Sequence, residues 1–104
     1  MADSGSSLVH LCVTLQRRDL VELLIKFYPE LNLNQRNKQD ATPLHLAIIY
    51  DDLDMARLLI QLGADASLTM KTQTCLQIST EFNYNNFVEF FSQPVSLLQK
   101  HIPI

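Results

Sequence analysis

The stretch ATPLHLA at residues 41–47 decides the fold of this chain. Thr42 has the side chain of a helix N-cap, since its hydroxyl can accept a bond from an unpaired amide of the first turn. Pro43 follows at the first helical position, where its missing N–H costs nothing. Leu44 and Ala47 then begin an apolar stripe at helical spacing, and Ala47 is small enough for a neighbouring helix to approach closely. The stretch therefore predicts a short helix with a defined start.

A second helix and a sharp stop follow this first one. Apolar residues recur through segment 55–62 with the spacing of one helix face. Gly63 can take a positive φ without steric cost and is expected to end the second helix. Residues 41–65 thus predict a helix–turn–helix unit that is closed by a glycine.

The same pattern recurs upstream of this unit. Residues 7–12 align with 42–47, and residues 19–25 align with 54–60, both at an offset of 35 residues. Self-similarity at such a fixed period is the sequence signature of repeat proteins, in which each unit buries its apolar face against its neighbours. The chain is therefore expected to be an array of stacked repeats.

A third copy is present in altered form. Residues 74–79 align with 42–47 at an offset of 32, and the aromatic segment 87–91 takes the place of 55–59. This copy lacks the proline and the histidine of the central unit, as is typical of terminal repeats. We expect an all-α solenoid with repeats at about 7–36, 40–71 and 72–92, a lead-in at 1–6 and a cap or tail at 93–104.

The composition indicates one small intracellular domain. The 104 residues carry a formal net charge of −3, which argues against direct binding to nucleic-acid phosphates. Cys12 and Cys75 are too few for a disulfide framework and are expected to be reduced core residues. No run approaches the roughly 18 apolar residues of a transmembrane helix. Residues 1–4 lack the basic and apolar features of a signal peptide.

Segment 42–47, together with Gly63-Ala64-Asp65 after the second helix, resembles the signature of ankyrin repeats. Further features resemble the inhibitors of NF-κB (IκB) and the ankyrin halves of the NF-κB precursors. They are the helix 44–50 followed by acidic residues where most ankyrin repeats carry glycine, the lengthened connection 29–43, and the segment 63–68. The resemblance implies a non-enzymatic module that binds a Rel/NF-κB subunit and occludes its nuclear-localisation or DNA-binding surface.

The chain also departs from that family. IκB proteins generally have about twice as many repeats, and their degron places a second serine four positions after the serine of Asp-Ser-Gly. Here Asp3-Ser4-Gly5 is present, but Leu8 stands at the required position. Ser7 aligns with Thr42, so a capping role for the first helix explains this stretch better than a degron does. A short stack without regulatory ends resembles small viral ankyrin proteins proposed to act as decoys.

The resemblance to ankyrin proteins places the binding surface on the loop tips and the outward face of each first helix. The residues expected to contact the partner are Asn37, Lys38, Gln39, Tyr50, Asp51, Asp52, Met70 and Lys71. Tyr50 is the leading candidate, because Tyr is common among the residues that dominate interfaces; its alternative is partial burial against the next repeat. Asp51 and Asp52 suit a basic peptide, and the alternative is a cap on the second helix.

Catalysis and metal binding are not expected. His10 with Cys12, or His45 with either cysteine, could be imagined as a nucleophile pair or as metal ligands. The two histidines instead occupy equivalent repeat positions, where ankyrin proteins use His to tie one turn to the next. The sequence contains no CxxC, HExxH or Gly-rich phosphate loop. It therefore predicts no enzyme, no metal and no cofactor.

Two other interpretations of the function stay open. The chain could be a generic ankyrin adaptor, or a fragment of a larger scaffold, with no Rel partner. It could also self-associate through exposed repeat ends, an idea suggested by the short array and by the pair Phe90-Phe91. The expected location is the cytoplasm, with the nucleus as a second location. Pro94 could open one more helical turn that caps the stack, or the tail could be frayed.

Overall fold

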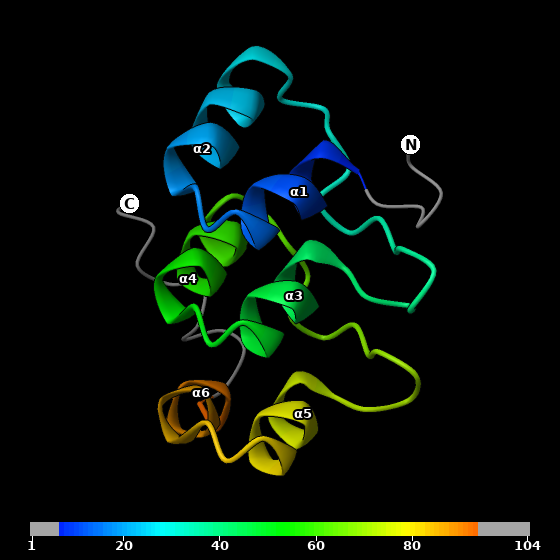
Figure 1. Ribbon diagram of the computed structural model, residues 1–104, viewed down its shortest axis with the longest axis vertical. Helices are drawn as coiled ribbons and strands as arrows, with labels where there is room; N and C mark the ends of the chain where they lie inside the picture. Colours follow the sequence, from blue (N-terminus) through cyan, green and yellow to red (C-terminus); the bar gives the residue numbers. More distant parts are fainter. Residues whose placement is uncertain (1–6, 94–104) are drawn as a thin grey trace.

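The computed structural model describes residues 7–93 and shows six helices arranged as three helix–turn–helix pairs (Figure 1). The helices are α1 (Leu8–Thr14), α2 (Arg18–Phe27), α3 (Pro43–Ile49), α4 (Leu53–Gln61), α5 (Cys75–Glu81) and α6 (Asn85–Phe91). In the described residues the β-structure consists of one isolated bridge, between Met70 and Gln73. The predicted all-α fold of three stacked repeats is confirmed. No helix between residues 7 and 93 is both long and apolar enough to cross a bilayer.

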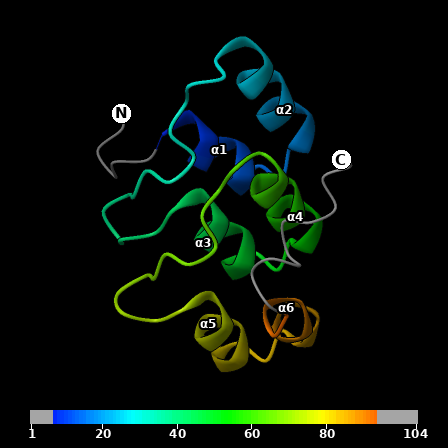
Figure 2. The ribbon, with the colours of Figure 1, turned by 180° about the vertical axis from the view of Figure 1, so that it is seen from behind.

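The helices form two layers. The first helix of each pair, α1, α3 and α5, lies in one layer, and α2, α4 and α6 lie in the other (Figure 1). Within the first layer, α3 packs against both α1 and α5. The two long loops before α3 and α5 extend side by side from the edge of this layer, as Figures 1 and 2 both show. We call the tip of the first loop, residues 36–41, finger 1, and the tip of the second, residues 68–73, finger 2.

The first helix of every repeat begins in the same way. Ser7, Thr42 and Thr74 are the N-caps of α1, α3 and α5, and each hydroxyl accepts the amide of the residue three positions on. The side chain of that third residue, a histidine in two repeats and a glutamine in the last, accepts the amide of the N-cap in return. This reciprocal capping box satisfies two amides that would otherwise lack partners. The predicted capping roles of Ser7 and Thr42 are confirmed.

The helix ends use the left-handed conformation. Gly63 follows α4 with φ 113°, as predicted. The first helix of each repeat instead ends at a residue with a side chain: Gln16 (φ 58°), Asp51 (φ 57°) and Asn83 (φ 60°). At these ends two successive amides turn back to carbonyls of the last turn at 2.8–3.1 Å, the pattern of a Schellman motif. The left-handed conformation costs roughly 1 kcal/mol at Gln16 and less at Asp51 and Asn83, because Asp and Asn side chains tolerate it.

The core runs through the whole stack and includes both cysteines. Cys12 and Cys75 are free thiols with 6% and 3% exposure, in agreement with their predicted place in the core. Phe90 is also buried, and Phe91 is half-buried with its ring stacked on that of Phe87 at 5.9 Å. The pair Phe90-Phe91 therefore does not form an exposed apolar end, because Phe90 lies beside Arg57 of the second repeat and Phe91 stacks on Phe87. The Asp3-Ser4-Gly5 segment and the expected cap at Pro94 lie outside the described residues.

Candidate protein-binding surface

Two buried histidines join each repeat to the loop of the next. Nδ1 of His45 accepts the Thr42 amide at 2.9 Å, so its proton lies on Nε2, which donates to the Leu68 carbonyl at 3.0 Å. His10 makes the same bonds, with its Nε2 2.9 Å from the Ala41 carbonyl. Burial lowers the pKa of both imidazoles below the usual value of 6.5. Both nitrogens of each ring are occupied and the rings are neutral, which leaves neither histidine free as a metal ligand or general base.

Each finger is shaped by its own hydrogen bonds. In finger 1, the Asn37 side-chain oxygen accepts the amides of Gln39 at 2.9 Å and Ala41 at 3.0 Å. In finger 2, Met70 and Gln73 exchange backbone bonds at 2.9 and 3.0 Å around two residues of positive φ, as in a tight hairpin turn. The two loop tips are thus ordered turns, and Asn37 has a structural role in one of them.

The two fingers are also clamped together. The Arg36 guanidinium donates to the Thr69 carbonyl at 2.6 Å, and the Lys71 amide donates to the Asp40 carboxylate at 2.7 Å. The bond from Lys71, helped by the nearby charge of Arg36, holds the pKa of Asp40 below its usual value. These cross-links fix the spacing between the tips, so a partner meets a preorganised surface.

The predicted contact residues fall into two groups. Three finger residues, Lys38, Gln39 and Lys71, are exposed at the loop tips, whereas Asn37 and Met70 are half-buried in the turns. The second group, residues 50–52, lies at the opposite end of α3, about 10 Å away along a seven-residue helix. The structure brings the finger residues together but does not join them to the second group.

In the turn between α3 and α4, some side chains are exposed to a partner and others cap α4. Tyr50 is 44% exposed and Asp51 is exposed, so both are accessible to a partner. Asp52 is half-buried, and its carboxylate accepts the Met55 amide at 3.2 Å as the N-cap of α4. Asp54 lies in the first turn of the same helix, where a carboxylate favours the helix dipole. The capping alternative therefore holds for Asp52.

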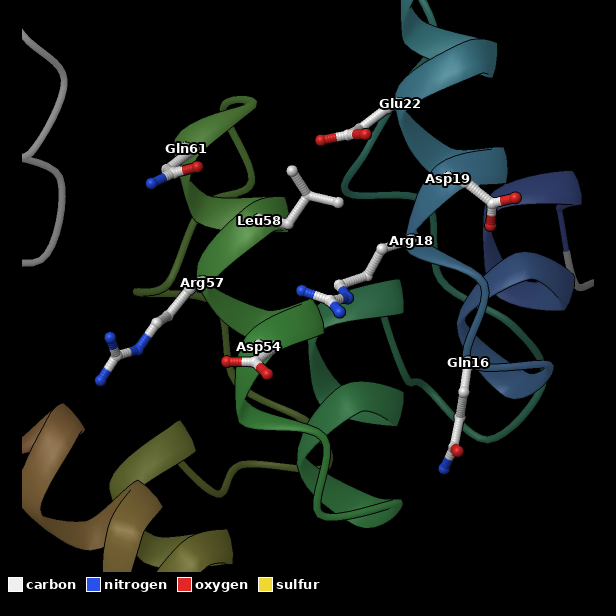
Figure 3. Close-up of a pocket in the computed structure, with 8 residues that line it drawn as sticks. All are labelled: Gln16, Arg18, Asp19, Glu22, Asp54, Arg57, Leu58 and Gln61. Atoms are coloured by element: carbon white, nitrogen blue, oxygen red, sulfur yellow. The ribbon is translucent and has the colours of Figure 1, made fainter.

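A polar groove on the other layer was not predicted from the sequence. It has a volume of about 560 Å³ and lies between α2 and α4, on the side away from the fingers (Figure 3). Its lining carries charges of both signs, with Arg18 reaching from α2 toward α4 and Asp54 on α4 (Figure 3). Arg57 points away toward α6, where its guanidinium lies 5.4 Å from the centre of the Phe90 ring. Sequence patterns give little sign of this groove, because it depends on how two neighbouring repeats are spaced.

Metal ligands and the cysteine thiols are the other groups on which chemistry could rest. Between residues 7 and 93 no group of three or more histidine, cysteine, aspartate or glutamate side chains is placed to hold a metal ion. Burial raises the pKa of the Cys75 thiol to about 12, which makes it a poor nucleophile at neutral pH. What the surface offers is ordered loop tips, an exposed tyrosine and separated patches of charge, which are features for recognising another macromolecule.

Comparison with known proteins agrees with this geometry. The family described as "Ankyrin repeats (3 copies)" matches residues 9–97. The chain belongs to the ankyrin-repeat family. Ankyrin repeats are protein-interaction modules and are generally not enzymes, so this stack is a protein-binding module.

Individual relatives of this ankyrin stack are diverse. It is 34% identical to the chicken (Gallus gallus) nuclear factor NF-kappa-B p105 subunit over 70 residues, or 64% of the chain. It is 32% identical to alpha-latrotoxin-Lhe1a of Latrodectus hesperus over 65 residues, or 62% of the chain. It is 33% identical to human protein phosphatase 1 regulatory subunit 27 over 88 residues, or 85% of the chain. The matches span 7%, 5% and 56% of these relatives, so they share only a part with this chain.

Proposed function

We propose that this ankyrin stack binds a Rel/NF-κB subunit and occludes its localisation or DNA-binding surface, as IκB proteins do. The observation that carries the proposal is the exposed pair Tyr50 and Asp51 in the turn after α3. Asp51 adopts a left-handed conformation that aspartate tolerates, and its carboxylate is exposed to solvent beside Tyr50. The similarity to the p105 subunit supports the choice of a Rel partner.

The charges on the surface define the kind of segment that fits it. The fingers carry the exposed cations Lys38 and Lys71, while the turn after α3 carries the exposed carboxylate of Asp51. A segment that lies along α3 would therefore place basic residues at the turn and acidic residues at the fingers. Such complementarity contributes mainly to the rate of association and to the rejection of wrong partners. Tyr50 supplies an apolar contact beside Asp51, at the end of α3 that lies opposite the fingers.

Titration of a purified Rel-homology dimer with the whole chain tests the proposal. We expect saturable binding, and we expect DNA to be displaced from the dimer as the complex forms. The double variant Tyr50→Ala with Asp51→Lys should bind about tenfold more weakly or worse, because it removes the aromatic contact and reverses the charge. Glu22→Lys is the matched control, since it makes the same charge change on α2, in the other layer, and should bind like the wild type.

Two results would count against the proposal. If the folded wild-type chain shows no saturable binding to any Rel-homology dimer, the partner is wrong. If binding occurs but the double variant and the wild type have the same affinity, the surface is misplaced. Circular dichroism of every variant is needed in both cases, because a loss of helix would produce the same loss of binding.

A generic ankyrin adaptor is the second candidate. It is favoured by the comparisons themselves, because the identity to the latrotoxin and to the phosphatase regulatory subunit is within two percentage points of that to p105. Under this alternative the finger tips and Tyr50 contact a protein that is not a Rel subunit. The chain would then fail to displace DNA from Rel dimers, while the Tyr50 and Asp51 double variant would still weaken binding to the true partner.

A further inference from the structure

The first repeat presents an apolar surface at the N-terminal end of the stack. The side chains of α1 and α2 enclose an open groove of about 360 Å³ there, and every residue that lines it is apolar. We call this surface the N-terminal face and define it by Leu8, Leu11, Cys12, Leu20, Leu23, Leu24, Phe27 and Tyr28. Phe27 is 65% exposed and Leu11 is 51% exposed. Such large side chains are rarely gathered on one open surface of a soluble monomer.

This face is a repeat-packing surface. Leu11 aligns with Leu46 of the second repeat, which is half-buried, and with Ile78 of the third, which is buried. Leu24 aligns in the same way with Leu59, which is fully buried. In the second and third repeats these positions have a preceding repeat beside them, because α3 packs against α1 and α5 packs against α3. In the described residues 7–93, no such repeat lies over the first one.

The opposite end of the stack has a different character. Thr80 and Ser92 of the third repeat stand where the second repeat has Ile48 and Ile60, both of which are buried. The Thr80 hydroxyl donates to the carbonyl of the residue four positions earlier at 2.8 Å, and the Ser92 hydroxyl does so at 2.6 Å. A polar outer face is the mark of a repeat that caps a solenoid. The third repeat shows this change at these two positions, while Leu76 and Phe82 of the same repeat remain exposed. The first repeat does not show it.

We propose that the N-terminal face is the interface of a symmetric dimer, in which two copies of this chain pack α1 and α2 of one against α1 and α2 of the other. Five side chains of this face are about half exposed or more: Leu8, Leu11, Leu23, Phe27 and Tyr28. Together they offer on the order of 550 Å² per copy, or about 1,100 Å² for two copies, which is above the roughly 1,000 Å² that a specific interface needs. The area is thus sufficient for a specific dimer.

The uncharged lining of the N-terminal face favours a twofold dimer over a head-to-tail arrangement. A twofold interface brings the same patch of both copies together, so the patch must be compatible with itself. The lining of the N-terminal face contains no charged residue, and two copies therefore meet without like-charge contacts. A head-to-tail arrangement would instead cover the polar surface of Thr80 and Ser92 with leucines, and would continue into a filament. The closed dimer buries apolar area on both sides.

The dimer leaves the candidate protein-binding surface open. Figures 1 and 2 show the fingers and the turn after α3 away from the end of the stack formed by α1 and α2. Each dimer therefore carries two copies of that surface, whatever partner they bind. Two linked sites bind a twofold or multivalent partner more tightly than one site does, with no additional contact.

Sedimentation equilibrium of the whole chain, from low micromolar to several hundred micromolar, tests the dimer. We expect the wild type to reach the mass of a dimer and no higher. Leu11→Lys and Leu23→Lys should each weaken the dimer about a hundredfold, because each places two unpaired charges in the interface of the two copies. Both residues are about half exposed, so the folded monomer should keep its helical circular dichroism signal.

Leu76→Lys is the matched control. Leu76 is a partly exposed leucine of α5, on the opposite end of the stack, and its replacement should leave the dimer unchanged. A wild-type monomer at all concentrations would overturn the proposal, and would point to another part of the chain or another protein over this face. Masses that increase beyond the dimer would overturn the twofold arrangement. Equal dissociation by Leu76→Lys and Leu11→Lys would show that the face is misplaced.

Discussion

Replacing His45 by glutamine removes a side chain that titrates and keeps one that can accept the amide of the N-cap. In the third repeat the equivalent residue is Gln77, whose side-chain oxygen accepts the Thr74 amide at 2.8 Å. A glutamine at position 45 can therefore accept the Thr42 amide in the same way. The bond from His45 to the Leu68 carbonyl is the contact at risk. Losing it should lower the free energy of unfolding at alkaline pH by about 1 kcal/mol.

The pH dependence gives the sharper result. The folded state keeps His10 and His45 neutral, because Nδ1 of each ring accepts an amide N–H and burial lowers the pKa from 6.5. In the unfolded chain each ring binds a proton below about pH 6.5, so the unfolded state takes up protons that the folded state does not. Stability from these rings is complete above that pH and is lost as the pH falls through 6.5 toward the lower folded value. Each ring has a limiting slope of about 1.4 kcal/mol per pH unit.

Urea unfolding, followed by circular dichroism at intervals between about pH 5 and pH 8, measures this slope. The pKa of Asp40 lies below its ordinary value of 3.8, and that carboxylate therefore contributes little in this window. We expect His45→Gln to remove about half of the slope, and the double variant with His10→Gln to remove nearly all of it. A double variant that keeps the wild-type slope would refute the reasoning, because it would place the titrating groups elsewhere.

Three further predictions concern the turns, the fingers and the core. Gln16→Gly should stabilise the fold by about 1 kcal/mol, because it relieves the left-handed strain. Gln61→Gly, at the last residue of α4, should instead destabilise it by less than about 1 kcal/mol, and equal signs in urea unfolding would contradict this. Arg36→Ala should speed hydrogen exchange of the Lys71 amide by loosening the clamp, as NMR would show, with exchange in α3 as the reference. The Cys75 thiol should react with a disulfide reagent at pH 8 only as fast as the fold opens, since its pKa is about 12; rapid labelling of the native chain would disprove its burial.

The parts of the fold that were predictable are those set by local chemistry. The helix starts at Ser7 and Thr42 and the stop at Gly63 follow from side chains that serve amides or backbone angles a few residues away. The repeat period then determined which helices pair. The inward direction of Phe90 and Phe91 was not predictable from composition, because it depends on the register of α6 against the rest of its repeat.

The candidate site was predictable to a smaller extent. The exposure of Lys38 followed from its place at a loop tip, whereas the sequence left the exposure of Tyr50 open and did not predict the bond between Arg36 and Thr69. The acceptor of that bond is a backbone carbonyl, which every residue has, so the sequence does not indicate which residue accepts it. The sequence also did not show which of Asp51 and Asp52 caps α4, because either carboxylate could accept an amide of its first turn. The structure shows that Asp52 is the cap.

The bonds between repeats have a consequence for how quickly the chain can fold. Within residues 7–93, the hydrogen bonds that link one repeat or its loop to the next join positions 23 to 35 apart, from His45 with Leu68 to Tyr84 with Ile49. No long loop has to close before native contacts can form, and chains with such local topology fold rapidly. The first two repeats can also dock while the third is still being synthesised. Folding can therefore proceed from the first repeat to the last, at the rate at which the ribosome supplies the chain.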